Sequence, residues 1–328
     1  MELPRSHSKL FDWLFIVTFG WQVAGVFLDG WAHTHLNAAL ETFFTPWHAV
    51  LYSGFLANLI LLVALRIRGK MPHEYKISFY GALLFIASAI GDLLWHQLFG
   101  IESGIDALLS PTHLLLAISG AIMTGAALHT VWRRHPSENS RNPWLVVISF
   151  SYVFMTILFM LQFLNPFNFP WLAQSFHTAF PLGLDQAGGL GVANAIVYTL
   201  VLMGMVCSVL NNFKFPFGGF TLILGLSTLA TTLMHGQYGF FVGTMLVAGL
   251  VIDILYSSLQ NSLHKRNVVR LLGFAIPVII FSCYTVSIFL FDALWWSVHL
   301  ITGTIVIAGL AGYLLTFVYR PPYHDQST

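Results

Sequence analysis

Residues 78–98 read SFYGALLFIASAIGDLLWHQL, an apolar run in which Asp92 is the one charged residue. About 20 apolar residues in an α-helix are long enough to cross the ~30 Å hydrocarbon core of a bilayer. The run therefore predicts a membrane-spanning helix. Its two ionisable side chains, Asp92 and His96, fall near the C-terminal end of that helix.

Nine further runs share this length and composition. Together the predicted spans are 11–31, 43–65, 78–98, 110–132, 144–164, 188–210, 217–235, 238–258, 269–291 and 294–318. The sequence thus predicts an all-α fold, a polytopic transmembrane helical bundle of about ten spans built from repeated helical hairpins. We expect one transmembrane domain over 1–328, with duplicated hairpins at 11–65 and 78–132 and the remaining spans at 144–318.

The composition supports a membrane location. The chain is 57% hydrophobic and only 8% charged, whereas a soluble domain carries about 25% charged residues. So few polar groups cannot cover a water-facing surface, and the lipid bilayer is the predicted partner. A formal net charge of +1 without a basic tract excludes a nucleic-acid-binding protein.

The positive charges fall on one side of this arrangement. Cytoplasmic loops of membrane proteins are enriched in Lys and Arg. If the loops are numbered alternately from the N-terminus, one side receives all 14 basic residues: Arg5, Lys9, Arg66, Arg68, Lys70, Lys76, Arg133, Arg134, Arg141, Lys214, Lys265, Arg266, Arg270 and Arg320. This partition predicts an integral protein of the plasma (inner) membrane with both termini in the cytoplasm.

The opposite, extracytoplasmic side collects acidic residues and histidines. These are Asp29, His33, His35, Glu41, His48, Asp92, His96, Glu102, Asp106, His113, His177, Asp185, His235, Asp292 and His299. No Lys or Arg falls on this side to pair with the carboxylates.

Two hairpins repeat one pattern on that side. The first reads Asp29-x3-His33 and then Glu41-x3-Thr45-Pro46-x-His48, and the second reads Asp92-x3-His96 and then Asp106-x3-Ser110-Pro111-x-His113. A degenerate third copy is Asp292-x3-Trp296 followed by His299. The repetition indicates an internal duplication, which many membrane folds use.

The spacing predicts that each hairpin brings three side chains together. Asp and His four residues apart share one helix face. Ser/Thr-Pro is typical of a helix start, with the hydroxyl residue as N-cap and Pro in the first turn. The histidine that follows therefore lies in the first turn of the returning helix, at the depth of the Asp-x3-His pair.

The electrostatics of this arrangement favour a bound cation. A carboxylate is disfavoured at a helix C-terminus and an imidazolium at a helix N-terminus. Neutral imidazole is the form that binds metals, and a divalent cation supplies the missing positive charge. We therefore predict a divalent metal ion (copper, iron or zinc, with manganese also compatible with N and O donors). The predicted ligands are Asp29, His33, His48, Asp92, His96 and His113. Two alternatives stay open, a structural His–carboxylate network and a proton-binding or pH-sensing role.

The Asp-x3-His motif with a later His resembles the copper site in the C subunit of membrane-bound methane and ammonia monooxygenases. The resemblance covers Asp29, His33 and His48, or Asp92, His96 and His113, with a longer spacing to the last His here. It implies a copper site at these residues. The segment from His96 to His113 is also similar to bacterial polytopic membrane proteins of unassigned function.

Three functional hypotheses follow. The first is a metal-dependent membrane enzyme, an oxidoreductase or a hydrolase, that acts on a small or lipophilic substrate, with Glu102 or Asp106 as general base. The second is a non-catalytic subunit or assembly factor that binds other membrane subunits. The third is a metal transporter or metal-delivery protein, which the nearly uncharged middles of the spans disfavour.

Overall fold

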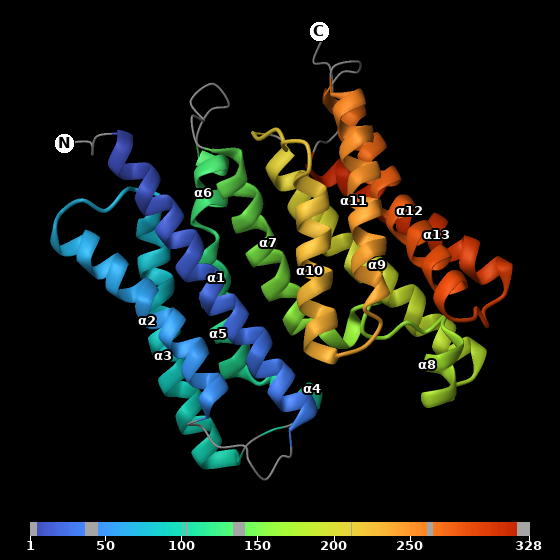
Figure 1. The fold of residues 1–328 in the computed structure, drawn as a ribbon, viewed down its shortest axis with the longest axis horizontal. Coiled ribbons are helices and arrows are strands. Elements are labelled where there is room, and N and C mark those ends of the chain that lie inside the picture. Colours follow the sequence, from blue (N-terminus) through green and yellow to red (C-terminus); the bar gives the residue numbers. More distant parts are fainter. Residues whose placement is uncertain are drawn as a thin grey trace, which may run out of the picture. The chain divides into compact units, whose positions relative to one another are not determined.

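The computed structural model describes residues 5–36, 45–100, 102, 104–133, 142–210, 212–260 and 265–319, and they are helical apart from short connections and one isolated antiparallel bridge, Ala173 with Leu294 (Figure 1). The helices are α1 (Arg5–His35), α2 (Pro46–Ile67), α3 (Tyr75–Phe99), α4 (Gly104–Leu109), α5 (Pro111–Thr124), α6 (Ala126–Arg133), α7 (Pro143–Met160), the 3-10 helix η3 (Gln162–Leu164), α8 (Gln174–Ala179), α9 (Leu184–Leu210), α10 (Gly219–His235), α11 (Phe240–Leu259), α12 (Lys265–Phe291) and α13 (Val298–Tyr319).

Most of the predicted membrane-spanning segments coincide with long apolar helices. Among the described residues, eight helices are long and apolar enough to cross a membrane, and α5 and α10 are shorter apolar helices. Large apolar side chains such as Leu98 and Val318 are about three-quarters exposed, as expected for surfaces that face lipid. The all-helical, multi-pass prediction is confirmed, whereas the count of ten spans and the cytoplasmic termini stay predictions.

The segment predicted as one span at 110–132 is two helices, α5 and α6, which meet at Gly125. Two backbone carbonyls at this junction accept hydrogen bonds from side chains of other helices. The hydroxyl of Ser78 donates to the carbonyl of Met123 at 2.8 Å, and the hydroxyl of Ser149 donates to the carbonyl of Thr124. Serine hydroxyls on neighbouring helices are among the groups that satisfy backbone carbonyls where a helix is interrupted at membrane depth.

Contacts between residues divide the chain into two units. The first comprises 1–163 and 233–236, and the second comprises 164–232 and 237–328. The single domain expected for 1–328 stays a prediction. Both duplicated hairpins belong to the first unit.

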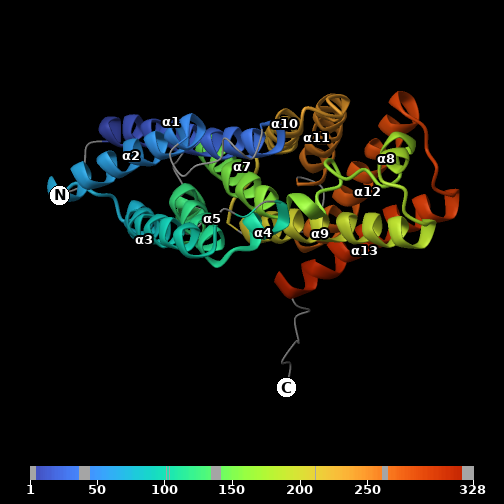
Figure 2. The ribbon, with the colours of Figure 1, turned by 90° about the horizontal axis from the view of Figure 1, so that it is seen from below.

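The first unit stacks the duplicated hairpins in two layers. Helix α1 packs along α2 in one layer, and α3 packs along α5 in the other (Figure 2). Stacked rings join the layers: Phe55 of α2 lies on Phe85 of α3 with centroids 4.5 Å apart, and Phe15 of α1 lies on Tyr75 of α3 at 4.3 Å. This buried aromatic core holds the polar ends of the two hairpins near each other.

Helices α1 and α2 approach closely enough to bring their backbones into contact. A methyl group at Gly25 would lie 2.5 Å from the Cα of Leu51, so only glycine fits there. Deeper in the pair, the buried amide of Asn58 lies 3.1 Å from the carbonyl of Thr18 and 3.0 Å from Oε1 of Gln22, and donates to both. These polar contacts fix how the two helices are aligned along their axes.

Candidate metal centre

The Ser/Thr-Pro signals start the returning helices as predicted. Thr45 and Ser110 are N-caps with extended backbone, and Pro46 and Pro111 open α2 and α5. The Thr45 hydroxyl accepts from the backbone N–H of His48 at 3.2 Å, and Ser110 does the same for His113 at 3.4 Å. Each cap therefore sets the first turn that carries a histidine.

The first hairpin brings Asp29, His33 and His48 together, here called the first triad. Their donor atoms all lie within 4.8 Å of one another, which is a geometry that can hold a metal ion. Oδ1 of Asp29 is 3.2 Å from Nε2 of His48 and 3.7 Å from Nε2 of His33.

The second hairpin does the same with Asp92, His96 and His113, the second triad. Oδ2 of Asp92 is 3.3 Å from Nε2 of His96, and its Oδ1 is 3.7 Å from Nε2 of His113. The two triads thus repeat the same three residue types, as the duplicated sequence pattern predicts, but Asp29 lies nearer the histidine of the returning helix whereas Asp92 lies nearer the histidine of its own helix.

These distances fit shared coordination. Ligand atoms about 2.0–2.1 Å from a tetrahedral zinc ion lie about 3.3–3.4 Å apart. The N···O distances within the triads, 3.2–3.7 Å, bracket this value. The longer pairs exceed the usual range of about 2.7–3.2 Å for an N–H···O hydrogen bond. Direct hydrogen bonding is therefore limited to the shorter pairs, and the 3.7 Å pairs would have to close by a few tenths of an ångström to share a tetrahedral ion.

Glu102 contacts His96 on the Nδ1 side of the ring, opposite the Nε2 atom that faces Asp92. Nδ1 of His96 is 3.1 Å from Oε2 of Glu102 and 3.2 Å from the carbonyl oxygen of Gly100. Two acceptors on that side favour a proton on Nδ1, which leaves the Nε2 lone pair directed at the triad. The other Glu102 oxygen accepts from the indole N–H of Trp95, so the carboxylate is itself held in place.

The other two members of the second triad also have polar partners. The hydroxyl of Thr112 donates to Oδ1 of Asp92 at 2.7 Å. The Ser110 hydroxyl lies 2.6 Å from Nδ1 of His113. Partners of this kind fix ligand orientation and raise metal affinity.

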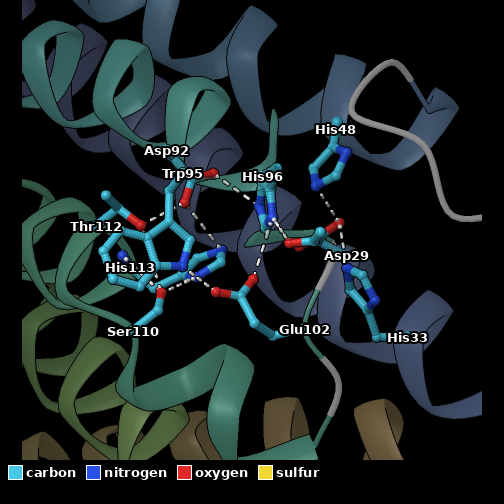
Figure 3. A network of polar contacts seen from close by, with 11 residues as sticks. Asp29, His33, His48, Asp92, Trp95, His96, Glu102, Ser110, Thr112 and His113 are labelled. Atoms are coloured by element: carbon cyan, nitrogen blue, oxygen red, sulfur yellow. Dashed lines mark hydrogen bonds and ion pairs between the residues drawn. The ribbon is translucent and has the colours of Figure 1, made fainter. Parts of the chain in front are cut away.

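Figure 3 shows the two triads facing each other, with Glu102, Trp95, Ser110 and Thr112 around the second. The ligand residues and the Ser110 cap were predicted from the sequence, but the contacts of Trp95, Glu102 and Thr112 with the ligands or with one another were not. Thr112 fills the variable position of Ser-Pro-x-His, and Trp95 directly precedes His96. Neither residue recurs at the equivalent position of the first hairpin, so the repeat does not mark them as partners of the ligands.

The repeat contains two further acidic residues, Glu41 and Asp106. Glu41 falls outside the described residues. Asp106 lies in the first turn of α4 and is exposed. The structure thus brings together the six predicted ligands in two groups of three, with Glu102 beside one group.

The third copy of the pattern is built differently. Asp292 follows the end of α12 and accepts hydrogen bonds from the backbone N–H of Ser175 at 3.3 Å and from the Ser175 hydroxyl. Trp296 is buried, and His299 is exposed in the first turn of α13. Asp292 therefore joins α12 to α8.

Comparisons of the chain with protein-family models, curated protein sequences and solved structures find no match. The resemblance to the monooxygenase C subunit thus stays a prediction carried by the motif residues. The structure independently shows that those residues form two groups able to hold a metal ion.

Proposed function

We propose that this protein is a metal-dependent integral membrane enzyme, an oxidoreductase or a hydrolase, with its site at the extracytoplasmic face. The observation that carries the proposal is the pair of Asp/His/His groups in four apolar helices of the first unit. The side assignment rests on the sequence, because 10–65 and 77–132 contain no Lys or Arg.

The donor set is typical of catalytic sites. Two imidazoles and one carboxylate leave coordination positions open for water or substrate, as in zinc hydrolases and in non-haem iron oxygenases. A bound metal would supply either an activated water or redox chemistry. Copper, iron and zinc all accept these N and O ligands.

The surroundings favour a lipophilic substrate. On α3, Asp92 is buried, whereas Leu94, Leu98 and Phe99 are 57%, 76% and 67% exposed on the outer surface of the same helix end. An apolar molecule dissolved in the bilayer can therefore approach along these side chains to the level of the second triad.

Glu102 and Asp106 are the candidate general bases. Both carboxylate oxygens of Glu102 contact neighbouring side chains, Trp95 and His96, which favours an orienting role. Asp106 is exposed and thus accessible to water. Within this proposal, Glu102 positions the ligand and Asp106 is the stronger candidate for proton transfer.

Elemental analysis of tag-free protein purified in detergent tests the proposal. We expect near-stoichiometric copper, iron or zinc in the wild type and its loss in a His33→Ala/His96→Ala double variant. His299→Ala is the matched control, because it removes an exposed His from the third hairpin and should leave the metal content unchanged.

A structural ion-pair network is the competing interpretation. Both ring nitrogens of His96 face a carboxylate, as they would in an imidazolium held between Asp92 and Glu102. If wild-type protein binds no metal even after reconstitution, the network explains the repeat and the enzyme proposal fails.

A further inference from the structure

The two triads are candidates for joint action because they share one structural unit. Helices α1 and α2 carry the first triad, and α3 and α5 carry the second. Helix α2 packs against α3, and α1 packs against α5. The triads therefore lie at the polar ends of two hairpins that are in direct contact.

Aromatic packing holds the two hairpins together near the triads. Phe55 of α2 stacks on Phe85 of α3 with ring centroids 4.5 Å apart. Phe55 lies seven residues after His48, and Phe85 lies seven residues before Asp92. Each of these two ligands is therefore about 10 Å along its helix from the same contact between α2 and α3.

The view of side chains agrees with this. In Figure 3, Asp29 lies between its own histidines and His96, so the two carboxylate–imidazole groups face each other.

The charges suit two cations. Each triad contributes one carboxylate and two imidazoles, and Glu102 adds a third carboxylate beside His96. Two nearby divalent ions repel each other, and this repulsion is reduced when an additional carboxylate lies close to one of them. No Lys or Arg occurs in 10–65 or 77–132 to neutralise these groups instead.

We propose that the two triads form a single two-metal centre that binds a pair of divalent cations side by side and presents both to one substrate. The inference rests on the proposed metal binding and adds that the two ions act as a pair. Two-metal centres stabilise attacking and leaving oxygens together, so such a centre suits a substrate whose reacting group offers oxygen atoms to both ions.

Electron paramagnetic resonance of the full-length, tag-free protein titrated with Cu²⁺ in detergent tests this inference. We expect two Cu²⁺ equivalents to bind and the second to cause dipolar broadening of the signal. His33→Ala and His96→Ala should each retain one equivalent with the narrow spectrum of an isolated ion. His299→Ala should behave as wild type.

The possible outcomes test the two-metal inference separately from the proposed metal binding. Two bound equivalents with no magnetic interaction in the wild type would overturn the pair and leave two independent metal sites. One bound equivalent would overturn the pair and leave a single site. No bound Cu²⁺ would overturn the pair and the proposed function together. The wild-type spectrum alone decides the pairing, so the result does not depend on the folding of the variants.

Discussion

The first and second triads share a sequence pattern and a hydroxyl N-cap, yet their surroundings differ. The side chain of His33 is 34% exposed and that of His96 is 14% exposed, and Asp29 is 17% exposed where Asp92 is 5% exposed. The third pair is reversed, since His48 is 21% exposed and His113 is 31% exposed, so two of the three ligands are more buried in the second triad. Electrostatic attraction between a cation and its ligands is stronger where water is excluded.

The residues behind the ligands differ as well. The hydroxyl of Thr112 holds Asp92, and Trp47 occupies the corresponding position of the first hairpin. Repeating a ligand pattern is thus enough to bring the same three residue types together. Affinity depends further on burial and on the partners that orient each ligand, and these do not follow from the duplicated spacing.

The largest expected effect is loss of a whole metal equivalent from one triad. We expect the second triad to take up the first Zn²⁺ equivalent, because two of its three ligands are more buried and its ligands are oriented. His96→Ala should remove the tight phase of a calorimetric Zn²⁺ titration, whereas His33→Ala should remove the weaker phase. The reverse assignment of the two phases would contradict the ranking of the triads.

Glu102→Gln should have the next largest effect. The amide keeps the shape of the side chain but loses the charge that faces Nδ1 of His96. Loss of such a partner typically weakens metal binding by about 10–100-fold. We expect only the tightly bound Zn²⁺ equivalent, assigned to the second triad, to lose affinity. Competition with a chelator measures this affinity.

Asp106→Asn is the matched control for Glu102→Gln. It removes an acidic side chain from the same connection but from an exposed position. An equal loss of affinity in both variants would show that general charge, rather than the contact with His96, is responsible.

Thr112→Val tests a neutral partner and should have a smaller effect. The substitution keeps the shape of the side chain and removes the hydroxyl that donates to Asp92. We expect a loss of tight-phase affinity near the lower end of that range, about 10-fold. Affinity indistinguishable from wild type would mean that burial alone sets the difference between the triads.

The third hairpin should show no effect on metal content. Asp292→Asn removes the charge that binds Ser175, and at this partly exposed site we expect a cost of about 1 kcal/mol in stability. Thermal unfolding in detergent should detect this cost while elemental analysis stays at the wild-type value. Reduced metal content would show that Asp292 contributes to binding after all.

The sequence predicted the triads well because their geometry is local. Asp-x3-His places two ligands on one helix face, and a cap followed three residues later by His places the third. The third hairpin shows the limit of this reasoning. Ser297 accepts from the backbone N–H of Leu300, so His299 is only two residues after the cap, about 100° around the helix from the ligand position.

Long-range features were beyond the sequence. The apolar character of 110–132 continues through Gly125, so nothing in the hydropathy marks the break between α5 and α6. The hydroxyls that donate to the carbonyls at this break come from Ser78 and Ser149 on other helices. Likewise, the meeting of the two triads depends on how the hairpins stack, which aromatic packing between layers decides.

The hydrogen bonds of the Asn58 amide set the position of α2 along α1, and with it the spacing of the first triad. Asn58 lies ten residues after His48, about 15 Å along α2. Its amide donates hydrogen bonds to Thr18 and Gln22 of α1. Sliding α2 by one residue along α1 would shift His48 by about 1.5 Å relative to Asp29 and break those bonds. An uncharged side chain deep in the apolar part of the helix pair therefore sets the ligand spacing at its polar end.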